Sequence, residues 1–167
     1  MKKTANALNQ ITLLFAFCFM AIGFQSCVEK PKEHELIVEE FNLTIAKAEI
    51  IIANKNFMAL VAAGDSVGLA NSYTKHAKFM SAGAPSVVGR ANIQTAMSNI
   101  VQSGITGVDI RLENIYGTAD LISEEGELTL FVGDEAVAVE KYIVLWKKED
   151  GKWKLFRDIF NSNLPAE

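Results

Sequence analysis

Cysteine, histidine and proline are scarce in this chain of 167 residues, which has two, two and three of them. The cysteines and histidines show no Cys-x-x-Cys or His-x-x-x-His spacing, so we expect no metal site and no cofactor. No glycine-rich loop follows a strand-like segment, which disfavours nucleotide binding. Acidic residues outnumber basic ones, and a net charge of −4 without a basic stripe argues against a nucleic-acid partner.

The N-terminus has the layout of a targeting segment. Lys2 and Lys3 precede an apolar run at residues 11–24, which is too short to span a bilayer comfortably. The run ends in the letters FQSC at residues 24–27, which resemble a bacterial lipobox. The resemblance implies cleavage before Cys27 and lipidation of that cysteine. An ordinary secretory signal and an uncleaved anchor are the alternatives.

Cleavage at this point would divide the chain into three parts. Residues 1–26 would be a lipoprotein signal peptide, residues 27–43 the lipidated cysteine and a tether, and residues 44–167 the folded domain. The protein would then be anchored by lipid in the bacterial cell envelope, at the outer membrane or facing the periplasm. With Cys18 removed and Cys27 lipidated, the domain would depend on packing rather than on disulfides. Residues 33–43 are either a tether or an added helix.

Hydrophobic spacing predicts helices in the first half of the domain. Residues 44–63 place Ile50 and Phe57 on one helical face, with Thr44 as the expected N-cap. Two further helices are expected at 67–73 and 91–102. Short extended segments are expected between these two helices, at 77–80 and 87–88.

The second half of the domain has the alternation of β-strands. Strands are expected at 107–115, 119–124, 127–132, 136–147 and 152–161. Gly126 separates the second from the third, and Asp150-Gly151 is a strong hairpin signal between the last two. Helices followed by an antiparallel meander indicate an α+β fold with helices on one face of a curved sheet.

Short motifs occur in the same order as in a known superfamily. They are Ala63-Gly64-Asp65, Tyr73-Thr74, Gly89-Arg90, Glu124-x-Gly126, Asp150-Gly151-x-Trp153 and Asp158-Ile159-Phe160-Asn161. Together they resemble the NTF2-like superfamily, and more narrowly its SnoaL-like and DUF4440 families, relatives of ketosteroid isomerase. The resemblance covers about residues 45–165. It implies a cone, in which a strongly curved antiparallel sheet packs around about three N-terminal helices and leaves a pocket, and it implies a homodimer.

Three side chains are candidates for proton transfer. His76 stands where the family usually has Asp, and histidine can shuttle a proton near neutral pH, although an idle surface position is the alternative. Glu124 and Asp158 lie within apolar strands, where an unpaired charge is costly. They could abstract a proton beside a carbonyl, as in ketosteroid isomerase. Alternatively, they pair with Arg90, Arg157 or backbone donors.

Six further side chains are expected to contact a ligand. They are Phe57, Tyr73, Met80, Tyr142, Trp146 and Asn161. The two tyrosines could donate hydrogen bonds to a polar ligand group, or simply fill the core. If the last strand is regular, Asn161 points away from the face that holds Asp158.

Three functions remain open on these residues. A lipid-anchored pocket that binds a small, largely apolar molecule is favoured, because no complete catalytic constellation is readable. The alternative is an isomerase, cyclase or hydrolase that acts on a small carbonyl compound with a pocket carboxylate or histidine. A non-catalytic dimeric scaffold is the second alternative.

Overall fold

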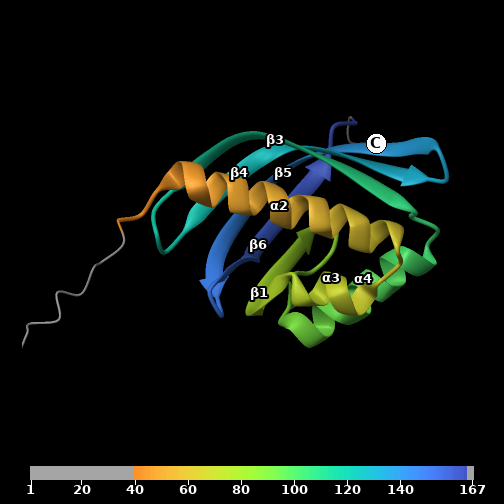
Figure 1. Cartoon of the computed structure of the whole chain (residues 1–167). Coiled ribbons are helices and arrows are strands. Elements are labelled where there is room, and N and C mark those ends of the chain that lie inside the picture. The colour runs from red at the N-terminus through yellow and green to blue at the C-terminus, as the bar shows by residue number, and fades with distance from the viewer. Residues whose placement is uncertain (1–39, 165–167) are drawn as a thin grey trace, which may run out of the picture. The chain divides into compact units, whose positions relative to one another are not determined.

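The computed structural model of the protein describes residues 40–164 (Figure 1). The expected signal peptide, the lipidation of Cys27 and the start of the tether lie outside the described residues. Between residues 40 and 164, no helix is both long and apolar enough to cross a membrane.

Within residues 40–164, three helices precede or interrupt the early strands: α2 (Leu43–Ala62), α3 (Ser66–Asn71) and α4 (Arg90–Gln102). The N-cap of α2 is Asn42, so the prediction of Thr44 was wrong. The Asn42 side-chain oxygen accepts hydrogen bonds from the backbone N–H groups of Thr44 and Ile45, at 2.9 and 3.2 Å. These groups have no partner within the helix, and the asparagine side chain supplies one.

Six strands form one sheet in the order β2-β1-β6-β5-β4-β3. They are β1 (Tyr73–Ser81), β2 (Val87–Val88), β3 (Gly107–Gly117), β4 (Ile122–Val132), β5 (Glu135–Glu149) and β6 (Lys152–Ser162). All neighbouring pairs are antiparallel except β1 and β6, which run parallel. The predicted α+β architecture is confirmed, with this one parallel pairing added to the antiparallel sheet.

Two of the expected strands are one continuous strand, because Gly126 lies inside β4 rather than in a turn. Gly126 pairs with Tyr142 of β5. A methyl group at position 126 would come within 2.1 Å of the Arg111 carbonyl oxygen and 2.8 Å of the Tyr142 hydroxyl. Glycine is therefore required here by the close approach of neighbouring groups rather than by a chain reversal.

The first strand is longer than its sequence predicted. It begins at Tyr73 instead of residue 77, because Tyr73 pairs with Leu155 of β6. A register shift follows before pairing resumes at Lys78. Similar shifts interrupt the pairing of β3 with β4, β4 with β5 and β5 with β6. Such irregularities increase strand bending, which suits a sheet that curves around helices.

The helices pack in the concave side of the sheet, with α2 crossing it and α3 and α4 lying together near one end (Figure 1). The largest fully buried apolar side chains come from the helices and the sheet alike: Ile50, Leu69, Tyr73, Ile93, Ile122 and Trp146. Glu124 is also fully buried. A carboxyl group buried among apolar side chains makes the concave face of the sheet the first place to look for a functional site.

Candidate functional site

A cavity of about 550 Å³ lies among α2, α4 and the concave face of the sheet. Most of its wall is aliphatic or aromatic, and its volume falls in the usual range of small-molecule sites. Its polar side chains include those of Asn54, Tyr73, Glu140, Tyr142 and Asp158.

Asp158 is held in this cavity by a tyrosine from another strand. The Tyr73 hydroxyl donates to Asp158 Oδ2 at 2.6 Å, and Asp158 is only 8% exposed. The ring of Tyr73 is fixed by edge contacts with Phe57 and Phe79, at centroid distances of 6.3 and 6.4 Å. Contacts within the protein therefore hold the tyrosine ring and the carboxyl against each other.

Burial raises the pKa of Asp158 to about 6. The hydrogen bond from Tyr73 opposes this shift, whereas the charges of Glu124 and Glu140 add to it. Burial, followed by the charge of Asp158 and the hydrogen bond to it, raises the pKa of Tyr73 well above its usual value. Asp158 thus changes its charge near neutral pH while Tyr73 stays a hydrogen-bond donor.

Glu124 lies behind the cavity wall and organises it. Its Oε1 accepts hydrogen bonds from Asn54 Nδ2 and the Tyr142 hydroxyl, both at 2.7 Å. Its Oε2 accepts one from Trp146 Nε1 at 2.8 Å. Burial raises the pKa of Glu124, and the three hydrogen bonds oppose this shift. Burial and the nearby charge of Glu124 also raise the pKa of Tyr142.

Glu124 and Asp158 do not pair with Arg90 or Arg157, the arginines that the sequence offered as possible partners. Arg90 donates to the Tyr73 carbonyl oxygen and pairs with Glu149. Arg157 donates to the carbonyl oxygens of His76 and Phe156. The partners of Glu124 and Asp158 are therefore uncharged donors.

Sequence reasoning missed two polar residues of the cavity. Asn54 follows Ile50 by one helical turn and shares its buried face, and a polar residue at an apolar position was the available signal. Glu140 precedes Tyr142 and Val144 at alternating positions of β5, which places all three on one face. Its Oε2 is buried without a hydrogen-bond partner in the described part of the chain, and burial raises its pKa.

The other predicted site residues divide between the cavity and the surface. Phe57 lines the cavity. Trp146 is buried as a donor to Glu124. Met80 is half-buried outside the cavity lining, and His76 and Asn161 are exposed. Alternation explains this division, because inward-facing residues of β1 and β6 are followed by residues that face outward.

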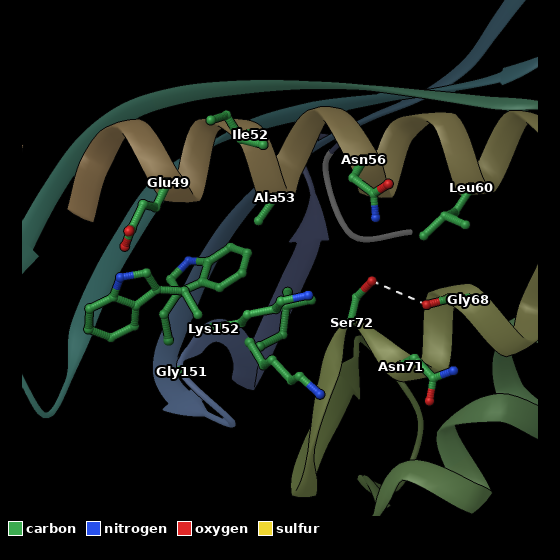
Figure 2. A pocket seen from close by; sticks show the side chains of 14 residues that line it. Glu49, Ile52, Ala53, Asn56, Leu60, Gly68, Asn71, Ser72, Gly151 and Lys152 are labelled. Atoms are coloured by element: carbon green, nitrogen blue, oxygen red, sulfur yellow. Dashed lines mark hydrogen bonds between the residues drawn. The ribbon is translucent and has the colours of Figure 1, made fainter. Parts of the chain in front are cut away.

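A second hollow of about 730 Å³ lies between α2, α3 and the turn that joins β5 to β6. Figure 2 shows Glu49, Ile52, Ala53, Asn56 and Leu60 along α2, across from Asn71 and Ser72. The Ser72 hydroxyl donates to the Gly68 carbonyl oxygen. Among the described residues that line this hollow, the carboxyl is that of exposed Glu49, whereas the first cavity contains the buried Asp158, so the first cavity is the stronger candidate site.

No protein-family model matches the sequence, and no curated protein matches it. Solved structures do match. An NTF2-like protein from Novosphingobium aromaticivorans is 15% identical with a TM-score of 0.63, over 74% of this chain and 86% of that one. An NTF2-like protein of unknown function from Pseudomonas putida is 16% identical with a TM-score of 0.63, over 74% and 91%. A ketosteroid isomerase-like protein from Erwinia carotovora is 19% identical with a TM-score of 0.56, over 71% and 96%. Likeness at these identities is a likeness of fold, and the described part of this protein therefore has the NTF2-like fold.

Proposed function

We propose that the protein binds a small, largely apolar molecule in the cavity among α2, α4 and the sheet. The observation that carries this proposal is the combination of an apolar cavity of about 550 Å³ with a few fixed polar groups. Apolar walls provide affinity, and convergent polar atoms orient a ligand. The pair formed by Asp158 and Tyr73 is the principal orienting group.

Two alanines on the same helix provide a matched test. Ala96 of α4 lines the cavity, whereas Ala91 of α4 is exposed. Nile red, a neutral dye that fluoresces in apolar surroundings, is titrated into wild type, A96F and A91F. We expect wild type and A91F to enhance its emission and A96F to lose most of the enhancement, with all three folded by circular dichroism. Equal enhancement in all three would place the dye elsewhere and reject the cavity as the binding site.

An enzyme is the second candidate, as an isomerase that acts on a small carbonyl compound. The observation in its favour is that the pKa of Asp158, about 6, suits a group that takes up and releases a proton near neutrality. Cyclase and hydrolase activities need the same kind of group. A β,γ-unsaturated ketone is the test substrate, since isomerisation gives a conjugated enone that ultraviolet absorbance detects. Conversion no faster with wild type than with D158N would reject this candidate.

We also propose that Cys27 carries lipid and anchors the protein in a bacterial envelope. The support is the short apolar run and the FQSC sequence at residues 24–27. Expression in bacteria with an alkyne-tagged palmitate should label the wild type and leave C27S unlabelled. Label on C27S, or a soluble unlabelled wild type, would contradict the proposal.

Dimerisation is a further proposal, and the outer face of the sheet supports it. Ile143 of β5 and Ile159 of β6 pair in register and are 47% and 48% exposed. Adjacent exposed isoleucines suit contact with a second copy. Sedimentation of wild type and I143E should give a dimer and a monomer, and two monomers would exclude this arrangement.

A further inference from the structure

The cavity has acidic side chains and no basic ones. Asp158 and Glu140 line it from β6 and β5, and Glu124 lies behind its wall. Among the residues that the structure describes, no lysine, arginine or histidine contributes to the lining. Burying a carboxylate without a counter-ion is unfavourable, so a positively charged ligand group is the one that these side chains would stabilise most.

Asp158 offers the cavity an acceptor atom without a donor. Within residues 40–164, Tyr73 is the donor to Asp158 and uses Oδ2, so Oδ1 has no donor in the described chain. Glu140 lines the cavity from the neighbouring strand β5, and its charge adds to the rise in the pKa of Asp158. Val144 is the β5 residue that pairs with Asp158, and Glu140 lies four residues before it with its Oε2 buried, so Glu140 contributes negative charge rather than a shared contact. A ligand that brings a donor would satisfy Asp158 Oδ1.

Aromatic rings form much of the remaining wall. Phe57, Tyr73, Phe79 and Phe160 all line the cavity, and the rings of Phe79 and Phe160 lie 5.1 Å apart between centroids. The faces of aromatic rings attract cations, and the attraction is strongest where water is excluded. Carboxylates and aromatic faces therefore both favour a positively charged ligand group.

We propose that the ligand of this cavity is a small aromatic or aliphatic amine, bound in its protonated form. The ammonium group donates a hydrogen bond to Asp158 Oδ1, the charge of Glu140 adds to the attraction, and the apolar body of the ligand packs against the phenylalanines. This inference rests on the proposed binding function and adds the charge of the ligand to it. A carboxylate ligand would meet like charge, and a carbonyl oxygen would bring a second acceptor to the unpaired oxygen of ionised Asp158.

The sign of the pH dependence follows from the groups that face the amine. They are Asp158 of β6, Glu140 and Tyr142 of β5, and Tyr73 of β1, with Glu124 of β4 behind them; α2 and α4 contribute no titratable lining residue. The carboxyls must be ionised to bind a cation. Amine affinity should therefore increase as the pH rises through about 6, the pKa of Asp158. A carbonyl ligand that accepts a hydrogen bond from neutral Asp158 would show the opposite trend.

The test compares naphthylmethylamine, naphthalenemethanol and naphthoate, which share one ring system and differ in charge. Each is titrated into the full chain by calorimetry at mildly acidic and mildly alkaline pH. At alkaline pH we expect the amine to bind about 10-fold more tightly than the alcohol or better, as a charge-assisted hydrogen bond allows, and naphthoate not to bind. Equal amine and alcohol affinities, or tighter naphthoate binding, would overturn the inference.

Three variants assign the effect to the cavity. D158N should weaken amine binding by about 10-fold more than it weakens alcohol binding, and E140Q should weaken the amine selectively by a smaller factor. E135Q, an exposed change on the same strand β5, should match wild type. If D158N does not fold, E140Q and the pH dependence of wild type still decide. Binding of Nile red without any preference for the amine rejects the charge assignment alone, whereas failure to bind Nile red and all three probes rejects the proposed function as well.

Discussion

The replacement of Glu124 by glutamine tests whether one buried carboxylate organises the cavity. Glu124 is 0% exposed and accepts three hydrogen bonds, from Asn54, Tyr142 and Trp146. Glutamine keeps the shape but replaces one acceptor oxygen with an NH₂ group. In place of Oε2 this group faces Trp146 Nε1–H, which can only donate, and in place of Oε1 it requires the Asn54 amide and the Tyr142 hydroxyl to turn and accept. Either arrangement disrupts the network, at a cost of about 1–3 kcal/mol for each group left unsatisfied. We therefore expect E124Q to lose roughly 2–5 kcal/mol, out of a total of about 5–15 kcal/mol for a typical domain.

Urea unfolding followed by tryptophan fluorescence measures this loss, and Trp146 reports on the network directly. The matched control is E125Q, the same change at the next residue, where the side chain accepts exposed hydrogen bonds from Asn114 and Tyr116. It should differ from wild type by no more than about 0.5 kcal/mol. An E124Q protein as stable as E125Q would refute the reasoning, since it would mean that Glu124 is already protonated and that glutamine mimics it.

Three further predictions concern stability. The pKa of Asp158 is raised from 3.8 to about 6 in the folded state, so its contribution to stability is greatest at low pH and decreases by about 3 kcal/mol as the pH rises through this interval; urea unfolding of wild type and D158N across pH should show that difference. G126A would place a methyl group 2.1 Å from a backbone oxygen, so its loss of stability should exceed the roughly 1–3 kcal/mol that overpacking usually costs. In the control G107A, the added methyl group lies at an ordinary 3.6 Å from its neighbour, and this variant should unfold at nearly the wild-type temperature. N42A should lose about 1 kcal/mol as a helix cap in thermal unfolding, and T44A, the residue first expected to cap, should lose less.

Local sequence patterns predicted the order of helices and strands well, because these elements depend mainly on residues that are near one another in the chain. Alternation identified the long strands, and Asp150-Gly151 located the last hairpin. The errors lie where residues that are distant in the sequence determine the bounds of a strand. Tyr73 begins β1 because it pairs with Leu155, and Gly126 stays inside β4 because Tyr142 and a neighbouring carbonyl approach it closely.

The candidate site was likewise predictable in part from the sequence. Charges inside apolar strands drew attention to Glu124 and Asp158, since such charges need partners. Their partners could not be read from the sequence, because Asn54 is 70 residues from Glu124 and Tyr73 is 85 residues from Asp158. The charged partners considered from sequence were arginines, whereas the fold supplies neutral donors. Only the tertiary arrangement determines which polar groups meet.

The position of β6 in the sheet affects how the protein is made. This strand is synthesised after the other strands that the structure describes, yet it lies between β1 and β5 and separates the strands of the first half from those of the second. Until the ribosome has released residues 152–162, β1 has no partner on that side and Tyr73 has no carboxyl to bond. Pairings between such distant segments form slowly. The sheet of a nascent chain would therefore stay divided until β6 has emerged, and a chain truncated before residue 152 would lack both the middle of the sheet and the Asp158 carboxyl of its cavity.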